Sequence, residues 1–340
     1  MGLASHLQLM DLGALELQGW ADEAVATAQI EGETLQVNSV RASAARRLGL
    51  ADAKALERDA RTEATLDVLQ AAIEQRHQPL THDILHGWQA ALFPTGRSGI
   101  QKIRTGAYRN HAEPMQIVTP RMGKPHIVHY QAPDSADVYP QMARLVEWFN
   151  SSHGKTDGLV RAALAHLWLE AIHPFEDGNG RVGRALVEMA LAQDLKTDKR
   201  LWSLSQQMWL DRAGYYAQLQ AATGQANMDV TPWVQWFVGC VHKAADATWG
   251  HMQAAMRKTR FWTELREQHP QLTPTQTKAI NKLYDVGPEG FANGISTEKY
   301  VNLCRVSRAT AYRELTALCE MGVLVQTGTG RGTRYQLIPL

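Results

Sequence analysis

Apolar residues recur at helical spacing through most of the chain. From Thr156 to Ile172 they fall at i, i+4, i+7, i+8 and i+11, which is the stripe of a helix buried along one face. After a short polar interruption the pattern resumes from Leu186 to Leu191, so two helices joined by a loop are predicted. Ala64 to Gln75 and Met142 to Phe149 are predicted as further amphipathic helices. The expected fold class is therefore mainly α.

One stretch, Gly106 to Tyr130, breaks this helical pattern. Met115 to Thr119 and His126 to Tyr130 are short runs of β-prone residues, separated by Pro120, Gly123 and Pro125. Prolines and glycines at such a position punctuate turns. We predict a small β-hairpin here.

The C-terminal part of the chain, Thr273 to Leu340, has a different pattern. Three short helical stretches precede two strands, Val323 to Gln326 and Arg334 to Ile338, which are joined by the glycine-rich Thr327 to Thr333. This order is typical of a winged helix-turn-helix. The predicted organisation is an N-terminal helical segment (1–75), a core (76–250), a linker helix (251–272) and a winged-helix domain (273–340).

Length and charge refine this picture. A chain of 340 residues is about twice the length of an average domain. Its 35 basic and 34 acidic residues leave a net charge of +1, which argues against a broadly basic coat for sequence-independent nucleic-acid binding. However, Ser296 to Leu340 carries +3 and the rest about −2, so a local DNA contact in the tail remains open.

Cysteine content and hydropathy bear on the compartment. The three cysteines, Cys240, Cys304 and Cys319, form no CxxC pair, which is typical of reduced thiols in a cytoplasm. No apolar run approaches the roughly 20 residues of a membrane span. Met1 to Met10 lacks the pattern of a secretion signal. We expect a cytoplasmic protein that does not enter a membrane.

The polar interruption, His173 to Arg184, reads HPFEDGNGRVGR and suits a polyphosphate site. Gly178 and Gly180 allow a tight turn whose backbone amides open the next helix, where unpaired N–H groups attract an anion. Arg181 and the last arginine of the loop follow in its first turn, where basic side chains oppose the helix dipole unless an anion is bound.

Three further side chains of the loop fit a reaction on phosphates. His173 stands at the start of the loop, and the unperturbed pKa of a histidine suits a general base at neutral pH. Asp177 is a hard oxygen ligand of the kind that Mg²⁺ requires, and Phe175 is expected to anchor the loop. The alternative is an ordinary connection between helices with surface charges, but the convergence of so many such residues in twelve positions favours a site.

The loop resembles the signature of a known family. HPFEDGNGRVGR matches the Fic-domain signature HPFx(D/E)GNGRxxR at every specified position. The resemblance implies a Fic-type helical bundle with a β-hairpin flap. It also implies a protein adenylyltransferase, which transfers AMP from Mg·ATP to a Ser, Thr or Tyr hydroxyl of a target protein and releases pyrophosphate. ATP is then the substrate and Mg²⁺ the cofactor.

The resemblance also implies individual roles. His173 would deprotonate the attacking hydroxyl, and Asp177 would hold Mg²⁺ between the α and β phosphates. Asn179, with the amides of the neighbouring glycines, would form an anion hole, and the two arginines would bind the β and γ phosphates. The implied ATP-binding residues are Phe175, Gly178, Asn179, Gly180, Arg181, Arg184 and Tyr216.

The resemblance also bears on the choice of reaction, on the adenine contact and on target binding. The phosphotransferase branch that resembles Doc toxins carries Lys where this chain has Gly180, so adenylylation is preferred to phosphorylation. Tyr216, in DRAGYYAQL, resembles the region that stacks the adenine, although a tyrosine on a helix is also a common core residue. Met115 to Tyr130 corresponds to the flap that positions a target by strand pairing, and an ordinary surface hairpin is the alternative.

A second motif lies upstream. Thr27 to Gly32 reads TAQIEG and fits the inhibitory pattern (S/T)xxxE(G/N) of family members with an N-terminal inhibitory helix. The resemblance implies that Glu31 pairs with Arg184 and blocks productive ATP binding; a solvated helix glutamate is the alternative. Some family members with this glutamate also remove AMP, so hydrolysis stays open. The chain begins late compared with relatives of this architecture.

The tail gives the competing interpretation. Ser307 to Cys319 is predicted as a recognition helix that starts at Ser307. The alternative function is a nucleotide-sensing, DNA-binding transcriptional regulator. Winged helices also serve as protein-docking or dimerisation units. A homodimer is compatible with the sequence. A metal hydrolase has little support, because neither His82 and His86 nor the pair at 126 and 129 lies in an HExxH motif. The candidate DNA contacts are Arg308, Arg313, Arg331 and Arg334.

Overall fold

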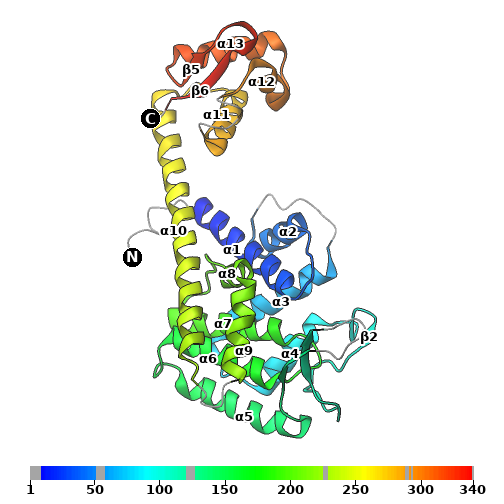
Figure 1. Cartoon of the computed structure of the whole chain (residues 1–340). Helices are drawn as coiled ribbons and strands as arrows, with labels where there is room; N and C mark the ends of the chain where they lie inside the picture. Colours follow the sequence, from blue (N-terminus) through cyan, green and yellow to red (C-terminus); the bar gives the residue numbers. More distant parts are fainter. Residues whose placement is uncertain are drawn as a thin grey trace. The chain divides into compact units, whose positions relative to one another are not determined.

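The computed structural model divides the chain into two compact units, Met1–His251 and Met252–Leu340. It describes residues 9–50, 58–119, 127–224, 229–287, 291 and 294–338, without the side chains of 9–11, 117–119, 127–129 and 331. The elements of both units are drawn in Figure 1. The mainly helical class expected from the sequence is confirmed.

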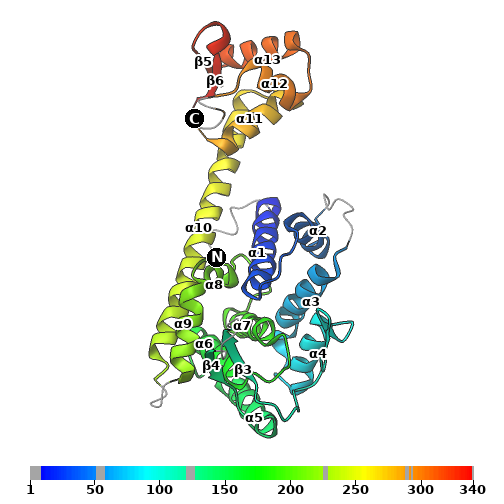
Figure 2. The ribbon, with the colours of Figure 1, turned by 45° about the vertical axis from the view of Figure 1, so that its right-hand side comes forward.

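Three helices open the first unit: α1 (Leu9–Ile30), α2 (Val37–Arg47) and α3 (Ala60–Glu74), followed by the 3₁₀ turn η1 (Gln75–His77). The Asp59 side chain caps α3 by accepting a hydrogen bond from the N–H of Thr62 at 3.0 Å. Trp20 and Ala24 of α1 pack in one small core with Leu66 of α3. In Figure 2, α1 also lies beside α8.

The larger core of this unit is built around α7, whose side chains are nearly all buried. A helix that is apolar on all sides belongs at the centre of a bundle, and α6 and α7 pack directly against each other. The Asp157 side chain caps α6 by accepting from the N–H groups of Leu159 and Val160. The helices of the bundle are α4 (His82–Leu92), α5 (Ser135–Ser152), α6 (Gly158–Ile172), α7 (Asn179–Leu195), α8 (Leu204–Leu210) and α9 (Arg212–Gly224).

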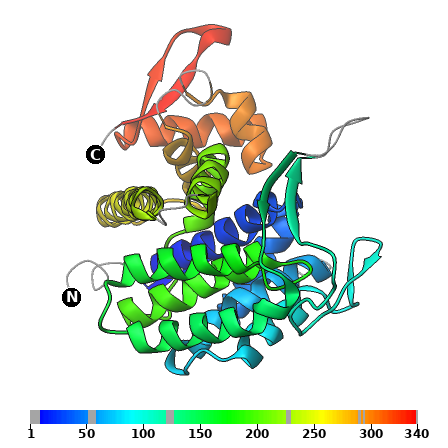
Figure 3. The same cartoon turned by 60° about the horizontal axis from the view of Figure 1, so that its bottom comes forward.

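Two antiparallel hairpins extend from the bundle. The first pairs β1 (Arg97–Ser98) with β2 (Gln101–Lys102), and the second pairs β3 (Gln116–Thr119) with β4 (Ile127–Gln131). The register of the second hairpin shifts between Ile117 and Val118, which is typical of a bulge. In Figure 3 this hairpin projects away from the helices. The expected hairpin is therefore present; His126, included in the predicted strand, lies outside the described residues.

The second unit contains three helices followed by a hairpin, in the order expected. A capping box between Thr273 and Gln276 starts α11, and an isolated bridge joins Ile295 to Tyr335 of the last strand. The elements are α11 (Pro274–Val286), α12 (Thr297–Cys304), α13 (Arg308–Glu320), β5 (Leu324–Thr327), η2 (Gly330–Gly332) and β6 (Arg334–Leu337).

The long helix α10 (Thr231–Gln268) contributes to both units. Trp233 and Phe237 belong to the core of the first unit, whereas Phe261 and Leu265 belong to that of the second. The segment 251–272, predicted as a separate linker helix, is therefore mostly the C-terminal part of α10 and supplies core residues of the second unit. The periodicity of α10 is continuous, so sequence alone marks no boundary within it.

Two simpler expectations concern cysteines and membranes. Cys240, Cys304 and Cys319 are all free thiols. Among the described residues, every helix is too short or too polar to cross a membrane.

Candidate active site

The loop HPFEDGNGRVGR connects α6 to α7 and turns sharply at both ends. His173 follows the last residue of α6 with a φ of 50°, in the left-handed region that non-glycine residues seldom adopt. Gly178 starts α7 with a φ of 89°, and a Cβ there would lie 2.9 Å from Cε2 of Phe93. A glycine is thus required at Gly178 both by its backbone and by its neighbour.

Asn179 closes the loop from within. Its Oδ1 accepts from the N–H of Phe175 at 2.8 Å, and its Nδ2 donates to the Phe175 carbonyl at 2.8 Å. The Phe175 ring is fully buried against His86 and Tyr108, which agrees with the expected anchor. Both polar atoms of the Asn179 side chain therefore help to hold the loop closed, and its part in an anion hole stays a prediction.

Arg109 holds the loop from outside and was missed by the sequence analysis. Its Nε donates to the carbonyl of His173 at 2.8 Å, and its backbone N–H donates to that of Pro174 at 2.8 Å. Its Nη2 donates to the carbonyls of Pro133 at 2.5 Å and Ile172 at 3.3 Å. Arg109 is buried. Nothing in its local sequence distinguishes it, because its partners lie 24 to 65 residues away.

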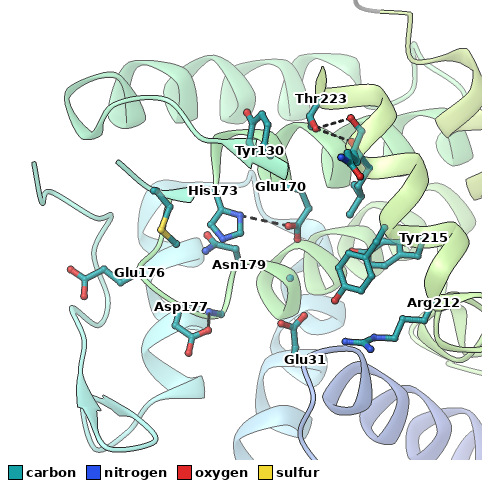
Figure 4. A pocket seen from close by; sticks show the side chains of 16 residues that line it. Glu31, Tyr130, Glu170, His173, Glu176, Asp177, Asn179, Arg212, Tyr215 and Thr223 are labelled. Atoms are coloured by element: carbon teal, nitrogen blue, oxygen red, sulfur yellow. Dashed lines mark hydrogen bonds and ion pairs between the residues drawn. The ribbon is translucent and has the colours of Figure 1, made fainter. Parts of the chain in front are cut away.

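A cavity of about 670 Å³ lies over the loop. Figure 4 shows His173, Asp177 and Asn179 on one side of it, Tyr215 and Arg212 of α9 on another, and Glu31 at the edge. Gly178 and Gly180 also line it. The cavity thus joins the signature loop, the N-terminal end of α7, α9 and the end of α1.

His173 is the nitrogen base of the cavity. Its side chain is 16% exposed, and burial lowers the pKa of the imidazole to about 4. The ring is therefore neutral at physiological pH, which is the state that a general base requires.

Asp177 is the exposed carboxylate of the loop. Its Oδ1 accepts from the N–H of Gly178 at 2.6 Å and lies 3.8 Å from Nη2 of Arg181. Its Oδ2 accepts from the hydroxyl of Ser98 on β1. In the described part of the chain no cluster of three or more metal-ligating side chains is present.

The structure brings Glu31 and Arg184 together, as expected. Nη2 of Arg184 donates to Oε1 of Glu31 at 2.7 Å, and Nε donates to the hydroxyl of Thr27 at 2.5 Å. Burial opposes ionisation of Glu31, but the charge and hydrogen bond of Arg184 outweigh it and lower the pKa of the carboxyl. Arg184 is 2% exposed. A Cβ on Gly180 would collide with Oε1 of Glu31, so a bulkier residue at this position would require the Glu31 carboxylate to move.

Arg181, the other arginine of the loop, is also paired with an acid from the N-terminal segment. Nη1 of Arg181 donates to Oε1 of Glu33 at 3.0 Å, and its guanidinium stacks over the ring of Phe93 at 4.9 Å. Glu33 was missed by the sequence analysis, which used only the six-residue inhibitory pattern. The sequence does show a second acid two residues after Glu31, but the partner of Glu33, Arg181, lies 148 residues away.

The two adjacent tyrosines of α9 behave differently. Tyr215 is buried, and its hydroxyl lies 2.9 Å from Nε2 of His166. Tyr216 is 42% exposed, lines the cavity, and donates to the carbonyl of Ile30 at 3.1 Å. Arg212 lies over the Tyr216 ring at 5.3 Å. Of the two, Tyr216 is thus the tyrosine that is exposed at the cavity.

The other candidate residues lie elsewhere. His82 is packed beside Tyr108, with Nδ1 2.7 Å from its hydroxyl, and His86 lies in the same aromatic cluster. In the second unit, Arg308 and Arg313 are exposed on α13. Ser307 caps this helix by accepting from the N–H of Thr310, as predicted. Arg334 is half-buried on β6, and the side chain of Arg331 is outside the described part.

Residues 70–191 match the model of the Fic/DOC family. The chain therefore contains a Fic domain, and α6, the signature loop and α7 belong to it. Residues 1–50, which include Glu31 and Glu33, match a domain of unknown function, DUF4172.

Curated relatives carry the same domain. Over 148 residues the chain is 32% identical to "Protein adenylyltransferase fic-1" of Caenorhabditis briggsae, covering 43% of this chain and 26% of the relative. Over 174 residues it is 29% identical to "Protein adenylyltransferase Fic" of Drosophila melanogaster, covering 51% and 32%. The chain thus spans about a third or less of these relatives.

Solved structures agree on the fold. A Fic family protein from Desulfovibrio desulfuricans G20 has a TM-score of 0.50 at 20% identity, with 99% of this chain and 95% of that chain covered. A Fic domain containing signaling protein from Bacteroides thetaiotaomicron has a TM-score of 0.54 at 18% identity, with 75% and 95% covered.

Proposed function

We propose that this chain is a protein adenylyltransferase that moves AMP from Mg·ATP to a Ser, Thr or Tyr hydroxyl of a target protein. The observation that carries the proposal is the convergence of His173, Asp177 and the N-terminal end of α7 on one cavity, with the side chain of Tyr216 at its wall. The names of the curated relatives support the same reaction. The free thiols are consistent with a cytoplasmic setting.

In this reaction His173 acts as the general base. The neutral imidazole takes the proton of the target hydroxyl, and the hydroxyl oxygen attacks the α-phosphorus of ATP. A new O–P bond forms while the bond from the α-phosphorus to the bridging oxygen breaks, and pyrophosphate leaves. Arg109 keeps the His173 backbone in place by its bond to the carbonyl.

The phosphates are bound by the start of α7. N–H groups in the first turn of a helix have no intrahelical acceptor, and the helix dipole favours an anion there. Gly180 lets phosphate oxygens approach the backbone, while Arg181 and Arg184 project from the same turn. These two arginines are the β- and γ-phosphate ligands in this proposal, after release from their present carboxylate partners.

Mg²⁺ fits this donor set. Asp177 is a partly exposed carboxylate at the cavity wall, and its side chain is 36% exposed. A small hard cation that binds nucleotide typically takes one or two protein carboxylates and fills its remaining positions with phosphate oxygens and water. When bound there, Mg²⁺ would neutralise charge on the phosphates. Asp177 is the residue that would hold it, and the hydroxyl of Ser98 orients that carboxylate.

The other residues of the cavity wall are the proposed contacts of the adenosine and of the target protein. Tyr216 offers its ring to the adenine. The β3–β4 hairpin, with Tyr130 anchored to the carbonyl of Ala171 at 2.6 Å, stands beside the cavity and is the proposed docking edge for an extended target segment.

In the state described, the enzyme is autoinhibited. Glu31 occupies Arg184 and Glu33 occupies Arg181, so neither arginine is free for phosphate. ATP then binds without its γ phosphate correctly placed. We also propose that the same site removes AMP by hydrolysis, with Glu31 positioning the water. The test is release of AMP from AMP-modified protein in the absence of pyrophosphate.

The test uses labelled ATP and three proteins: the unsubstituted chain, Glu31→Gly, and Glu31→Gly with His173→Ala. We expect at least a tenfold rise in self-labelling for Glu31→Gly, equivalent to roughly 1.4 kcal/mol of released interaction, and background labelling when His173 is lost. Mass spectrometry should find AMP on Ser, Thr or Tyr. No adduct on any protein from a Glu31→Gly strain would reject the proposal.

We further propose that the second unit is a winged-helix domain that binds DNA. The leading half of α13 exposes Arg308, Tyr312 and Arg313, and Arg305 lies exposed in the preceding turn with a φ of 55°. The acid in this half of the helix, Glu314, is engaged by the hydroxyl of Tyr300 at 2.7 Å. A helix whose first turns are basic and polar suits a DNA groove.

A gel-shift assay with DNA from the promoter region of the gene that encodes this chain tests the proposal of DNA binding. Replacing Arg308 and Arg313 together by Ala should weaken binding and reduce its salt dependence, whereas Arg257→Ala, an exposed arginine of α10, should not. Equal binding by all three proteins would exclude α13 as the contact. A nucleotide-sensing regulator would additionally require that ATP change DNA binding in the His173→Ala protein.

A further inference from the structure

Glu170 is a buried acid in the last turn of α6 that the reaction above does not use. Its side chain is 11% exposed and lines the same cavity as His173. Residues three apart on a helix share a face, and Oε2 of Glu170 lies 3.8 Å from Nδ1 of His173. Figure 4 shows the two side chains facing each other.

Both members of this pair have buried atoms without hydrogen-bond partners. Within the part of the chain that the structure describes, this holds for Oε1 of Glu170 and Nδ1 of His173. Such orphaned groups are rare in folded proteins, and a catalytic role is one of the few reasons for them. The space for Glu170 depends on Gly183 of α7, where a Cβ would lie 3.2 Å from Oε1.

We propose that Glu170 is a positioning residue for His173, its carboxyl accepting a hydrogen bond from the Nδ1–H so that Nε2 is free to act as the base. The inference rests on the proposed transferase function. A neutral imidazole carries its single proton on one nitrogen, and only the other accepts. Because Nδ1 is buried, Nε2 is the nitrogen that faces the cavity. The separation of 3.8 Å is the loose geometry expected before substrate binds.

The charges around the pair support this arrangement. Burial raises the pKa of Glu170 to about 8, and the negative charge of Glu31 adds to this effect. The positive charge of Arg184 opposes it. Tyr215 of α9 also faces this carboxyl. The carbonyl oxygen of a protonated carboxyl accepts a hydrogen bond as well, so Glu170 serves as acceptor on both sides of its pKa. His173 additionally faces Glu31, Arg109 and Asp177.

One competing acceptor is present. The backbone carbonyl of Glu170 lies near enough to the His173 ring to favour its protonated form. The two acceptors give different expectations, because substitution at Glu170 removes the carboxyl and leaves the carbonyl in place.

The experiment reads the tautomer of His173 directly by NMR. Protein labelled with ¹⁵N in histidine is prepared with Glu31→Gly alone and combined with Glu170→Ala, Glu170→Gln or the control Glu147→Gln, an exposed acid of α5. The His173 signals are assigned by their loss in His173→Ala. We expect the proton on Nδ1 in the parent and control, a shift toward Nε2 in Glu170→Ala, and recovery in Glu170→Gln, whose amide oxygen accepts.

An unchanged Nδ1–H tautomer in Glu170→Ala would overturn the proposal and assign the proton to the backbone carbonyl. If Glu170→Ala does not fold, the parent protein still decides the matter. Its His173 ring should carry the proton on Nδ1, and a proton on Nε2 in that protein would equally overturn it.

Activity provides the second readout. The maximal rate of self-labelling should fall roughly 10- to 100-fold in Glu170→Ala, a part of what a general base supplies, with the KM for ATP unchanged. A parent protein that labels nothing would reject the transferase function, while the tautomer measurement would still confirm or reject the role of Glu170. A rise in the KM for ATP at constant maximal rate would instead make Glu170 a nucleotide-binding residue and overturn the positioning role.

Discussion

Arg181 of the signature loop is paired with Glu33, with 3.0 Å between Nη1 and Oε1. This pair stands beside that of Arg184 and Glu31 at 2.7 Å, so both arginines of the signature are held by acids from one short segment at the end of α1. Glu33 is 31% exposed and Arg181 only 8%. The N-terminal segment therefore engages both of the arginines that are proposed to bind phosphate, not only Arg184.

Replacing Glu33 by Gln should strengthen ATP binding. In the Glu31→Gly protein we expect the KM for ATP to fall about two- to fivefold, because a partly exposed ion pair contributes roughly 0.5–1 kcal/mol. Glu147→Gln on α5 is the matched control. An unchanged KM would mean that Arg181 does not exchange Glu33 for phosphate.

Thr27→Val should loosen the inhibitory contact while keeping the side-chain volume. The Thr27 hydroxyl accepts from Nε of Arg184 at 2.5 Å, and both groups are buried. Leaving that N–H without an acceptor costs about 1–3 kcal/mol, so self-labelling should rise roughly fivefold or more in an otherwise unsubstituted chain. Thr65→Val on α3 removes a buried hydroxyl away from the site and should lower stability without activating the enzyme.

The pH profile of AMP transfer should keep its rate well below pH 6.5. Burial lowers the pKa of His173 to about 4, so kcat/KM of the Glu31→Gly protein at pH 6 should lie within about twofold of that at pH 7.5. A half-maximal rate near pH 6.5, the ordinary histidine value, would contradict a buried base.

The lowered pKa of His173 also makes the free energy of unfolding depend on pH. Between pH 6.5 and about 4 the unfolded chain binds a proton at His173 that the folded chain does not. Stability from this group is thus complete above pH 6.5 and is lost as the pH falls through that window, by up to about 1.4 kcal/mol per pH unit. Urea unfolding of His173→Gln over this range should show a correspondingly smaller slope.

Arg109→Ala should destabilise the first unit. The substitution removes donors from the carbonyls of His173, Ile172 and Pro133, and buried acceptors without partners are costly. We expect the free energy of unfolding to fall by about 2–4 kcal/mol, measured in urea by tryptophan fluorescence. Arg104→Ala, an exposed neighbour, should stay within about 0.5 kcal/mol; equal losses in both variants would remove the scaffold role of Arg109.

The sequence by itself predicted the mainly helical class, the helices α6 and α7 with the twelve-residue loop between them, and the β3–β4 and β5–β6 hairpins, but not the β1–β2 hairpin. Helical periodicity and turn residues act over a few positions, so they can be recognised without the fold. The loop is likewise local: Asn179 bonds Phe175 only four residues away. The pairing of Glu31 with Arg184, 153 residues apart, was predictable only through family resemblance.

Only the tertiary structure decided which groups are buried and what they face. Arg109 and Glu33 became visible as site residues because their partners arrive from distant segments. The pKa of Glu170 near 8 has the same origin, since burial and the charge of Glu31 both come from elements packed around α6. Desolvation and long-range pairing depend on how helices pack, and no short stretch of sequence contains that information.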